Sequence, residues 1–204
     1  MELHNLPILK AFLQKHNLWA KKELGQNFLI NKDVLDKIIE TANLSKTDMV
    51  IEIGPGLGIL TQELAPRVQR IISIELDYTL IPLLHETLNE YRNIEILNQN
   101  ALDYTPPSQT YKVVANIPYN ITSPLINLFL QAENKPVSMT LLVQKEVAEK
   151  ICDIEPDMTV LSLQIALFGQ AKIIQKVSAD SFYPAPKVDS AIIQITIYPE
   201  TDPN

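Results

Sequence analysis

Short apolar runs alternate with segments of helical period from Asn31 onward, and this alternation restricts the fold of the 204-residue chain more than any other feature. The runs with the length of buried strands are DMVIEIG, QRIISIEL, IEILNQN, YKVVANI and SMTLLVQ. The segments with helical spacing between them are GILTQELA, YTLIPLLHETLNEY, SPLINLFLQA and KEVAEKI. Strands that alternate with helices form a mainly parallel sheet with helices on both faces. We therefore predict an α/β fold.

The last part of the chain has a different pattern. AKIIQKV and VDSAIIQITIY are two strand-like runs, and SADSFYPAPK joins them without a helical segment. This pattern predicts an antiparallel pair of strands added to the parallel sheet.

The charge of the chain is uneven. The net charge of −7 argues against phosphate binding over the whole surface. Between Leu3 and Lys22, however, there are four lysines and no acid. This segment is either the solvated face of a helix, which we favour, or an arm that contacts RNA. The single cysteine, Cys152, fits a reducing cytoplasm, and no run approaches the roughly 20 apolar residues that span a bilayer.

A glycine loop follows the first predicted strand of the alternating region. Gly54, Gly56 and Gly58 stand before a helix, where the backbone can approach a ligand closely. Glu75 ends the next strand, 21 positions after Gly54, where a carboxylate can accept hydrogen bonds from a ribose diol. Dinucleotides and S-adenosylmethionine both bind to this layout. The loop lacks the G-x-G-x-x-G spacing, and Glu52 suits the cationic amino-acid end of S-adenosylmethionine, which we therefore favour.

A polar and aromatic motif, Asn116-Ile117-Pro118-Tyr119-Asn120, ends the fourth run. It is either an ordinary turn or a clamp for the exocyclic amine of a nucleobase. In the clamp, Asn116 Oδ1 and the carbonyl of Ile117 accept hydrogen bonds from the two N–H groups of the amine and so localise the nitrogen lone pair. Pro118 stiffens the turn, and the ring of Tyr119 stacks on the base, a contact worth roughly 1–3 kcal/mol.

Asn100, at the end of the third strand, has two interpretations of equal weight. Its side chain forms a turn, or it forms hydrogen bonds with the adenine of a bound nucleoside.

Taken together, these motifs resemble the ribosomal RNA adenine N6,N6-dimethyltransferases of the KsgA/RsmA type, which are relatives of the erythromycin-resistance methylases. The matching stretches lie between about Lys21 and Tyr198. They are KKELGQNFL, IEIGPGLGILT, IELD, NIPYNITSPLI, QKEVAEKI and FYPAPKVDSAI. The resemblance implies a Rossmann-like class I S-adenosylmethionine-dependent methyltransferase, with a mainly parallel seven-stranded sheet and an antiparallel final strand pair.

The resemblance also implies roles for individual residues. The catalytic set is Asn116, Ile117, Pro118, Tyr119 and Phe182, with Phe182 packing on the target base opposite Tyr119. Without the resemblance, Phe182 would be assigned to core or turn packing and Asn27 to a helix cap. The implied cofactor-binding residues are Gln26, Asn27, Leu29, Gly54, Gly56, Glu75, Leu76, Asn100, Ala101 and Asn116. No metal is implied.

Three departures from the family pattern are visible. Asn100 stands where members usually have aspartate, so we expect weaker cofactor binding. Met158 and Thr159 precede Val160, where members have Tyr-Gly. We expect the helical C-terminal domain of the family to be absent, since residues 1–204 end just after the last predicted strand. We expect a basic arm and cofactor-covering segment over residues 1–30 and the methyltransferase catalytic domain over residues 31–200.

The function implied by the resemblance is S-adenosylmethionine-dependent N6,N6-dimethylation of two adjacent adenosines near the 3′ end of small-subunit (16S) rRNA during subunit maturation. We expect the partners to be this rRNA and the precursor small-subunit particle, with no membrane, and we expect a cytoplasmic monomer. One alternative is a 23S rRNA adenine N6-methyltransferase of the erythromycin-resistance type. Another is a non-catalytic RNA-binding assembly or transcription factor on the same fold, against which the intact glycine loop, Glu75 and NIPYN motif argue.

Overall fold

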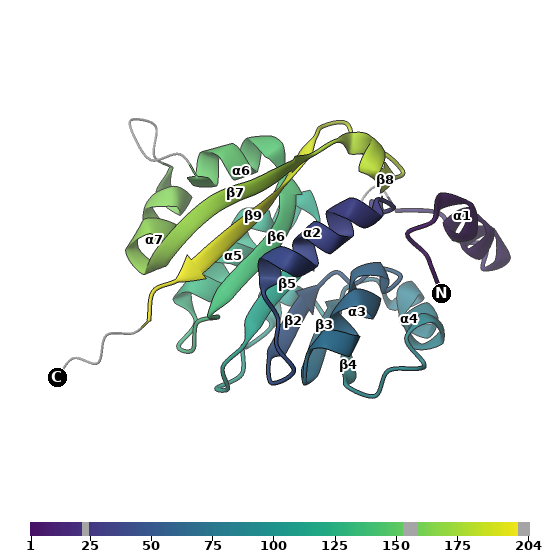
Figure 1. Ribbon diagram of the computed structural model, residues 1–204, viewed down its shortest axis with the longest axis horizontal. Coiled ribbons are helices and arrows are strands. Elements are labelled where there is room, and N and C mark those ends of the chain that lie inside the picture. Colours follow the sequence, from purple (N-terminus) through teal and green to yellow (C-terminus); the bar gives the residue numbers. More distant parts are fainter. Residues whose placement is uncertain (22–24, 153–158, 200–204) are drawn as a thin grey trace.

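A seven-stranded sheet forms the centre of the computed structural model, which describes residues 1–21, 25–152 and 159–199 (Figure 1). The strand order is β4-β3-β2-β5-β6-β9-β7. The first five strands in this order run parallel, β9 is antiparallel to β6, and β7 is antiparallel to β9. The predicted parallel sheet and antiparallel final pair are therefore confirmed. The strands are β2 (Met49–Ile53), β3 (Arg70–Glu75), β4 (Ile94–Asn98), β5 (Lys112–Asn116), β6 (Ser138–Gln144), β7 (Gly169–Val177) and β9 (Ser190–Ile197).

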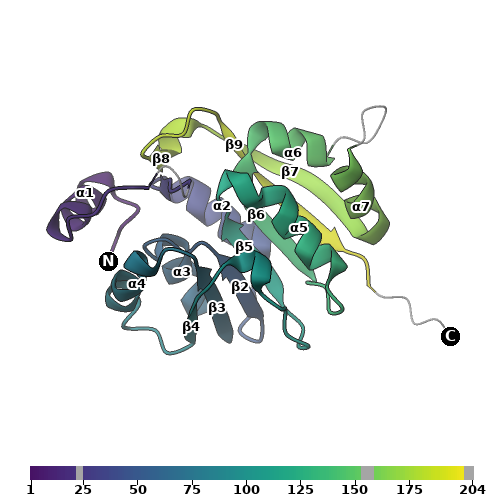
Figure 2. The same cartoon turned by 180° about the vertical axis from the view of Figure 1, so that it is seen from behind.

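Helices cover both faces of the sheet, as Figures 1 and 2 show from opposite sides. Neighbouring residues of a strand point to opposite faces, so Val50 packs in one layer of the core and Ile51 in the other. Because both faces are buried, the strands are continuous apolar runs. One face carries α2 (Lys32–Ala42), α3 (Ile59–Leu64) and α4 (Ile81–Thr87), and the other carries α5 (Thr122–Gln131), α6 (Lys145–Cys152) and α7 (Val160–Phe168).

Helix α7 was not predicted from the sequence. It is apolar on almost every side, with Leu163 and Leu167 exposed and Ile165 buried, so it lacks the amphipathic period of a surface helix. Thr159 is its N-cap and accepts a hydrogen bond from the N–H of Ser162 at 3.1 Å. Met158, which with Thr159 stands where family members have Tyr-Gly, lies outside the described residues. No helix in the described part of the chain is long and apolar enough to cross a membrane.

The basic segment near the start of the chain contains helix α1 (Leu6–Lys15). Leu9, Phe12 and Leu13 are buried, whereas Lys10 and Lys15 are exposed. This arrangement agrees with the solvated helix face that we favoured, and contact of this segment with RNA stays a prediction. Its last lysine, at position 22, lies outside the described ranges.

A second, two-stranded sheet joins the region before α2 to the region after β7. In it β1 (Phe28–Leu29) pairs antiparallel with β8 (Phe182–Tyr183). The N–H of Ile30 also donates to the carbonyl of Ser181 at 2.8 Å. Segments about 150 positions apart are thereby fastened together next to the carboxyl edge of the main sheet.

Asn31 begins α2 directly after this small sheet. Its Oδ1 accepts from the N–H groups of Asp33 at 3.0 Å and Val34 at 3.2 Å, and its Nδ2 donates to Ser181 Oγ at 3.2 Å. The side chain therefore caps the helix and links it to the segment that leads into β8.

We predict that Asn31→Ala lowers the free energy of unfolding by roughly 1–2 kcal/mol, because two N–H groups of the first helical turn lose their acceptor. Urea denaturation measures the change. The matched control is Asn5→Ala at the start of α1, where one exposed N–H, that of Ile8, lies 3.4 Å from the cap oxygen. An equal loss in both variants would contradict the special role of Asn31.

Candidate functional site

A cleft lies at the carboxyl ends of β2, β3 and β5. The strand order reverses between β2 and β5, because β3 and β4 follow on one side and β6 on the other. Ligands of open α/β sheets bind at this kind of switch point. The space between the lining residues, which includes open solvent, is about 1130 Å³.

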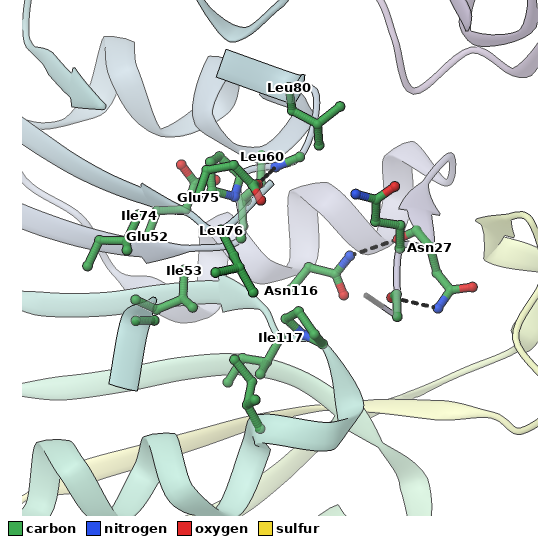
Figure 3. A pocket seen from close by; sticks show the side chains of 18 of the residues that line it. Asn27, Glu52, Ile53, Leu60, Ile74, Glu75, Leu76, Leu80, Asn116 and Ile117 are labelled. Atoms are coloured by element: carbon green, nitrogen blue, oxygen red, sulfur yellow. Dashed lines mark hydrogen bonds between the residues drawn. The ribbon is translucent and has the colours of Figure 1, made fainter. Parts of the chain in front are cut away.

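Most of the predicted site residues meet in this cleft, although they come from separate parts of the chain (Figure 3). Their contacts with a ligand stay predictions. The lining residues among them are Gln26, Asn27, Leu29, Gly54, Gly56, Glu75, Leu76, Asn100, Ala101, Asn116, Ile117, Pro118 and Tyr119.

Phe182 does not line the cleft. Its side chain is 2% exposed, and the residue pairs with Leu29 in the small sheet. In this structure the ring belongs to the core, which is the assignment that the residue receives without the family resemblance.

The glycine loop forms the floor between β2 and α3. Gly54 and Gly56 have φ angles of +65° and +62°, which residues with a Cβ rarely adopt. A Cβ on Gly54 would lie 3.5 Å from the ring of Pro118, and one on Gly56 would lie 3.4 Å from the ring of Phe28. The loop thus lies directly against the NIPYN motif and against β1.

Glu75 ends β3 beside this loop and is 6% exposed. Its Oε2 accepts from the N–H of Gly56 at 3.0 Å, and its Oε1 accepts from the N–H of Asp77 at 2.8 Å. Burial raises the pKa of Glu75 above its ordinary value, and the hydrogen bonds from these two N–H groups offset only part of that rise. Each carboxylate oxygen keeps a further lone pair, so the group can accept hydrogen bonds from a diol while it anchors the loop.

Glu52 is a second buried carboxyl group of the cleft, 1% exposed. Its Oε2 accepts from Thr61 Oγ1 at 2.7 Å and from Ser73 Oγ at 2.8 Å. Its Oε1 is buried and has no hydrogen-bond partner among the residues that the structure describes. Burial raises the pKa of Glu52 to about 7, and the neighbouring Glu75 contributes to the rise. An unpartnered acceptor of this kind fits a cationic group, such as the ammonium of S-adenosylmethionine.

Asn116 ends β5, and its amide has a defined orientation. Its Nδ2 donates to the backbone carbonyl of Asn27 at 3.1 Å (Figure 3). A carbonyl can only accept, so the amide nitrogen must face Asn27 and Oδ1 is left as an acceptor for another group. The next residue, Ile117, is held against β6 because its N–H donates to the carbonyl of Leu142 at 3.2 Å.

Further contacts around the cleft were not foreseen in the sequence. Tyr119 Oη and Ser190 Oγ lie 2.8 Å apart, so the fully buried Ser190 fixes the position of the phenol. Asp77 binds Lys21 and Gln26, which join the start of the chain to the end of β3. The matching stretches IELD and FYPAPKVDSAI contain Asp77 and Ser190, but no local pattern shows which side chains they meet.

Asn100 lines the cleft and caps a short 3-10 helix, where its Oδ1 accepts from the N–H of Leu102 at 3.1 Å. The turn-forming interpretation is thus confirmed, and contact with an adenine stays a prediction. Within the described ranges, no group of three or more His, Cys, Asp or Glu side chains is arranged to hold a metal ion.

The doubly wound sheet, the glycine loop and the two buried carboxyl groups at the switch point define a class I S-adenosylmethionine-dependent methyltransferase, with S-adenosylmethionine as its cofactor. The unpartnered Glu52 Oε1 and the close glycine loop fit this molecule. The chain belongs to the ribosomal RNA adenine dimethylase family, whose sequence model matches residues 17–203.

Similar curated proteins bear one name. Ribosomal RNA small subunit methyltransferase A of Dehalococcoides mccartyi is 44% identical over 197 residues, which cover 94% of this chain and 67% of the relative. The protein of the same name from Clostridium botulinum is 44% identical over 194 residues, 91% of this chain and 70% of the relative. The chain thus spans about two thirds of the length of these relatives.

Two solved structures are similar in both fold and sequence. A dimethyladenosine transferase from Plasmodium falciparum has a TM-score of 0.78 and 32% identity, with 84% of this chain and 63% of the other covered. The 23S rRNA methyltransferase ErmE has a TM-score of 0.80 and 35% identity, with 85% and 71% covered.

We predict that Glu52→Gln flattens the pH dependence of stability. The folded-state pKa of about 7 lies above the ordinary 4.5, so the contribution of Glu52 is complete below pH 4.5 and is lost as the pH rises to about 7. At 1.36 kcal/mol for each pH unit, this loss amounts to ~3 kcal/mol.

Urea denaturation of both proteins between pH 4 and pH 8, without cofactor, measures the difference. The variant keeps an acceptor for Thr61 and Ser73, so it should be more stable than the parent above pH 7. It should also bind S-adenosylmethionine more weakly by calorimetry, because an amide does not attract the ammonium group. Parallel stability profiles would show that Glu52 does not titrate in this range.

Proposed function

We propose that this chain uses S-adenosylmethionine to dimethylate the N6 atoms of two adjacent adenosines near the 3′ end of small-subunit (16S) rRNA, as a step in the maturation of the small subunit. The observation that carries the proposal is the amide of Asn116, whose oxygen is left as an acceptor at the cleft. The names of the similar curated proteins support the choice of the small-subunit rRNA.

The chemical obstacle to this reaction is the amine itself, because the lone pair of an exocyclic nitrogen is delocalised into the adenine ring. Asn116 Oδ1 and the carbonyl of Ile117 accept hydrogen bonds from the two N–H groups of the amine and so favour a tetrahedral nitrogen with a localised lone pair. S-adenosylmethionine supplies an electrophilic methyl group when it is bound. A nitrogen held in this way would accept the methyl group, with the thioether leaving with the electron pair of the C–S bond, and would then release one proton to water.

The other residues of the cleft position the reactants instead of exchanging protons. Tyr119 presents a ring on which the flipped adenine stacks, and its hydrogen bond to Ser190 keeps that ring in place. Glu75 accepts from the ribose of the cofactor, and Glu52 accepts from its ammonium group. Removing the adenine from its helix costs a few kcal/mol, which the stacking contact offsets in part.

The proposed substrate indicates where the enzyme acts and what it binds. We propose a monomer that acts in the cytoplasm on the precursor small-subunit particle, without a membrane. The N-terminal basic segment, which includes the exposed Lys10 and Lys15, is the proposed contact to the phosphates of the rRNA.

We predict methyl incorporation into undermethylated small ribosomal subunits, with four methyl groups for each particle at completion, and little incorporation into large subunits. Radiolabelled S-adenosylmethionine measures the incorporation, and nuclease digestion identifies N6,N6-dimethyladenosine. Incorporation of one or two methyl groups into large-subunit rRNA would instead assign the chain to the activity that the name of ErmE describes.

We predict that Asn116→Ala lowers the single-turnover rate by roughly 10²-fold, the usual effect of removing one preorganised group that acts in the transition state. The dissociation constant of S-adenosylmethionine should change much less, because the interaction strengthens only as the nitrogen becomes tetrahedral. Rapid-quench assays and calorimetry on the same samples give the two numbers. A loss of affinity as large as the loss of rate would make Asn116 a cofactor ligand only.

A further inference from the structure

A cluster of polar side chains lies beside the cleft, outside the proposed reaction centre. It consists of Lys21, Gln26, Asp77 and Thr79, and we call it the Asp77 latch. Asp77 follows β3 and is 4% exposed. Its Oδ2 accepts from Gln26 Nε2 at 2.8 Å, and its Oδ1 accepts from Lys21 Nζ at 2.8 Å. Thr79 adds an Oγ1 donor at 2.6 Å. This carboxylate therefore joins two residues of the N-terminal segment to the main sheet.

The amide of Gln26 can take only one orientation in the latch. Its Oε1 accepts from the N–H of Lys21 at 2.9 Å, while its Nε2 donates to Asp77. A flipped amide would set a donor against the N–H of Lys21 and an oxygen against the carboxylate. Both polar atoms of the side chain are thus engaged within the protein, although Gln26 lines the cleft.

The residues next to Gln26 reach the NIPYN motif directly. The ideal Cβ position of Gly25 lies 3.5 Å from the Cβ atom of Pro118. The carbonyl of Asn27 accepts from Asn116 Nδ2, and the side chain of Asn27 donates to the carbonyl of Gly25 at 3.0 Å. The segment thus connects the end of β3, through the latch, to the end of β5, through Asn116.

We propose that Asp77 is a positioning residue for methyl transfer. Its carboxylate holds Gln26, and the adjoining Asn27 carbonyl then keeps the amide of Asn116 turned so that Oδ1 faces the reacting amine. If the carbonyl of Asn27 moves away, the amide can rotate and present its N–H₂ group, which cannot accept from an amine. This inference rests on the proposed role of Asn116.

The backbone of Asp77 has a separate task, because its N–H donates to Glu75 Oε1 at 2.8 Å. Side-chain substitutions at position 77 leave that contact in place. The effects of Asp77 on the ribose-binding carboxylate and on Asn116 can therefore be separated by mutation.

The test uses an exchange of the two partners. Asp77→Asn replaces the carboxylate with an amide, so Gln26 Nε2 either faces an amide nitrogen or loses its charged acceptor. Gln26→Glu places a second carboxylate beside that of Asp77. The double variant Asp77→Asn/Gln26→Glu has the same net charge as the parent, and it can form the contact with donor and acceptor reversed while the N–H of Lys21 keeps its acceptor. The matched control is Glu86→Gln, which removes an exposed ion pair between the N-terminal segment and α4, that of Glu86 with Lys15.

The first measurement is hydrogen exchange of the Asn116 side-chain amide by ¹⁵N NMR, with its resonance identified by its absence in Asn116→Ala. We expect faster exchange in both single variants and slow exchange in the parent, the double variant and the control. Lys21→Met removes the ion pair between Lys21 and Asp77 at a partly exposed position and should give an intermediate exchange rate. This variant replaces a single variant that fails to fold. Unchanged protection in the single variants or Lys21→Met, or fast exchange in the double variant, overturns the proposal.

The second measurement is the single-turnover rate on small ribosomal subunits with saturating S-adenosylmethionine. We expect a roughly 10- to 100-fold loss in each single variant, the size that follows from misplacing a catalytic group. The double variant should recover most of this loss. In the Asn116→Ala background, Asp77→Asn should cause little further loss, because the two residues act as one unit. Additive losses overturn the proposal.

The two measurements separate this inference from the proposed function. A parent protein that transfers no methyl group to rRNA, but whose Asn116 amide follows the expected exchange pattern, disproves the proposed function and leaves the latch intact. If the parent is active but the exchange rate of the Asn116 amide does not change in the Asp77 and Gln26 variants, the proposed function stands and the proposed role of Asp77 is disproved.

Discussion

The reversal of strand order between β2 and β5 is the constraint on which the rest of the site depends. At this point the crossovers leave the sheet in opposite directions, so no helix covers the carboxyl ends of the two strands. The glycine loop, Glu75 and Asn116 then open into the same space because their strands are parallel and adjacent or nearly so. An antiparallel β5 would place Asn116 at the opposite edge of the sheet, away from the glycine loop and Glu75.

The cleft is electrostatically suited to a cation. Glu52 and Glu75 are both buried there, and their pKa values are raised because burial disfavours the ionised form. A positive charge bound in the cleft would compensate carboxylates that water no longer solvates. The burial that raises these pKa values therefore favours a cationic ligand over an anionic one.

The segment before α2 gives the cleft its second wall. It is fastened at one end by the pairing of β1 with β8 and at the other by the Asp77 latch. Between the two lies the carbonyl of Asn27, which orients Asn116. A short stretch with almost no secondary structure can therefore act as a rigid part of the site, because its polar groups are hydrogen-bonded to distant elements.

The sequence by itself determined the alternation of strands and helices, the antiparallel final pair, the glycine loop and the family motifs, because these depend on local period and local chemistry. It did not reveal α7, whose apolar residues show no helical period. For Phe182 the local sequence indicated packing, and the buried ring agrees with that assignment and not with the one that the family resemblance implied. Only the tertiary structure decided which distant groups meet: Asn116 and Asn27 are 89 positions apart, and Tyr119 and Ser190 are 71 apart. Such contacts arise from the packing of whole elements, and no pattern within one segment carries the orientation of an amide that another segment fixes.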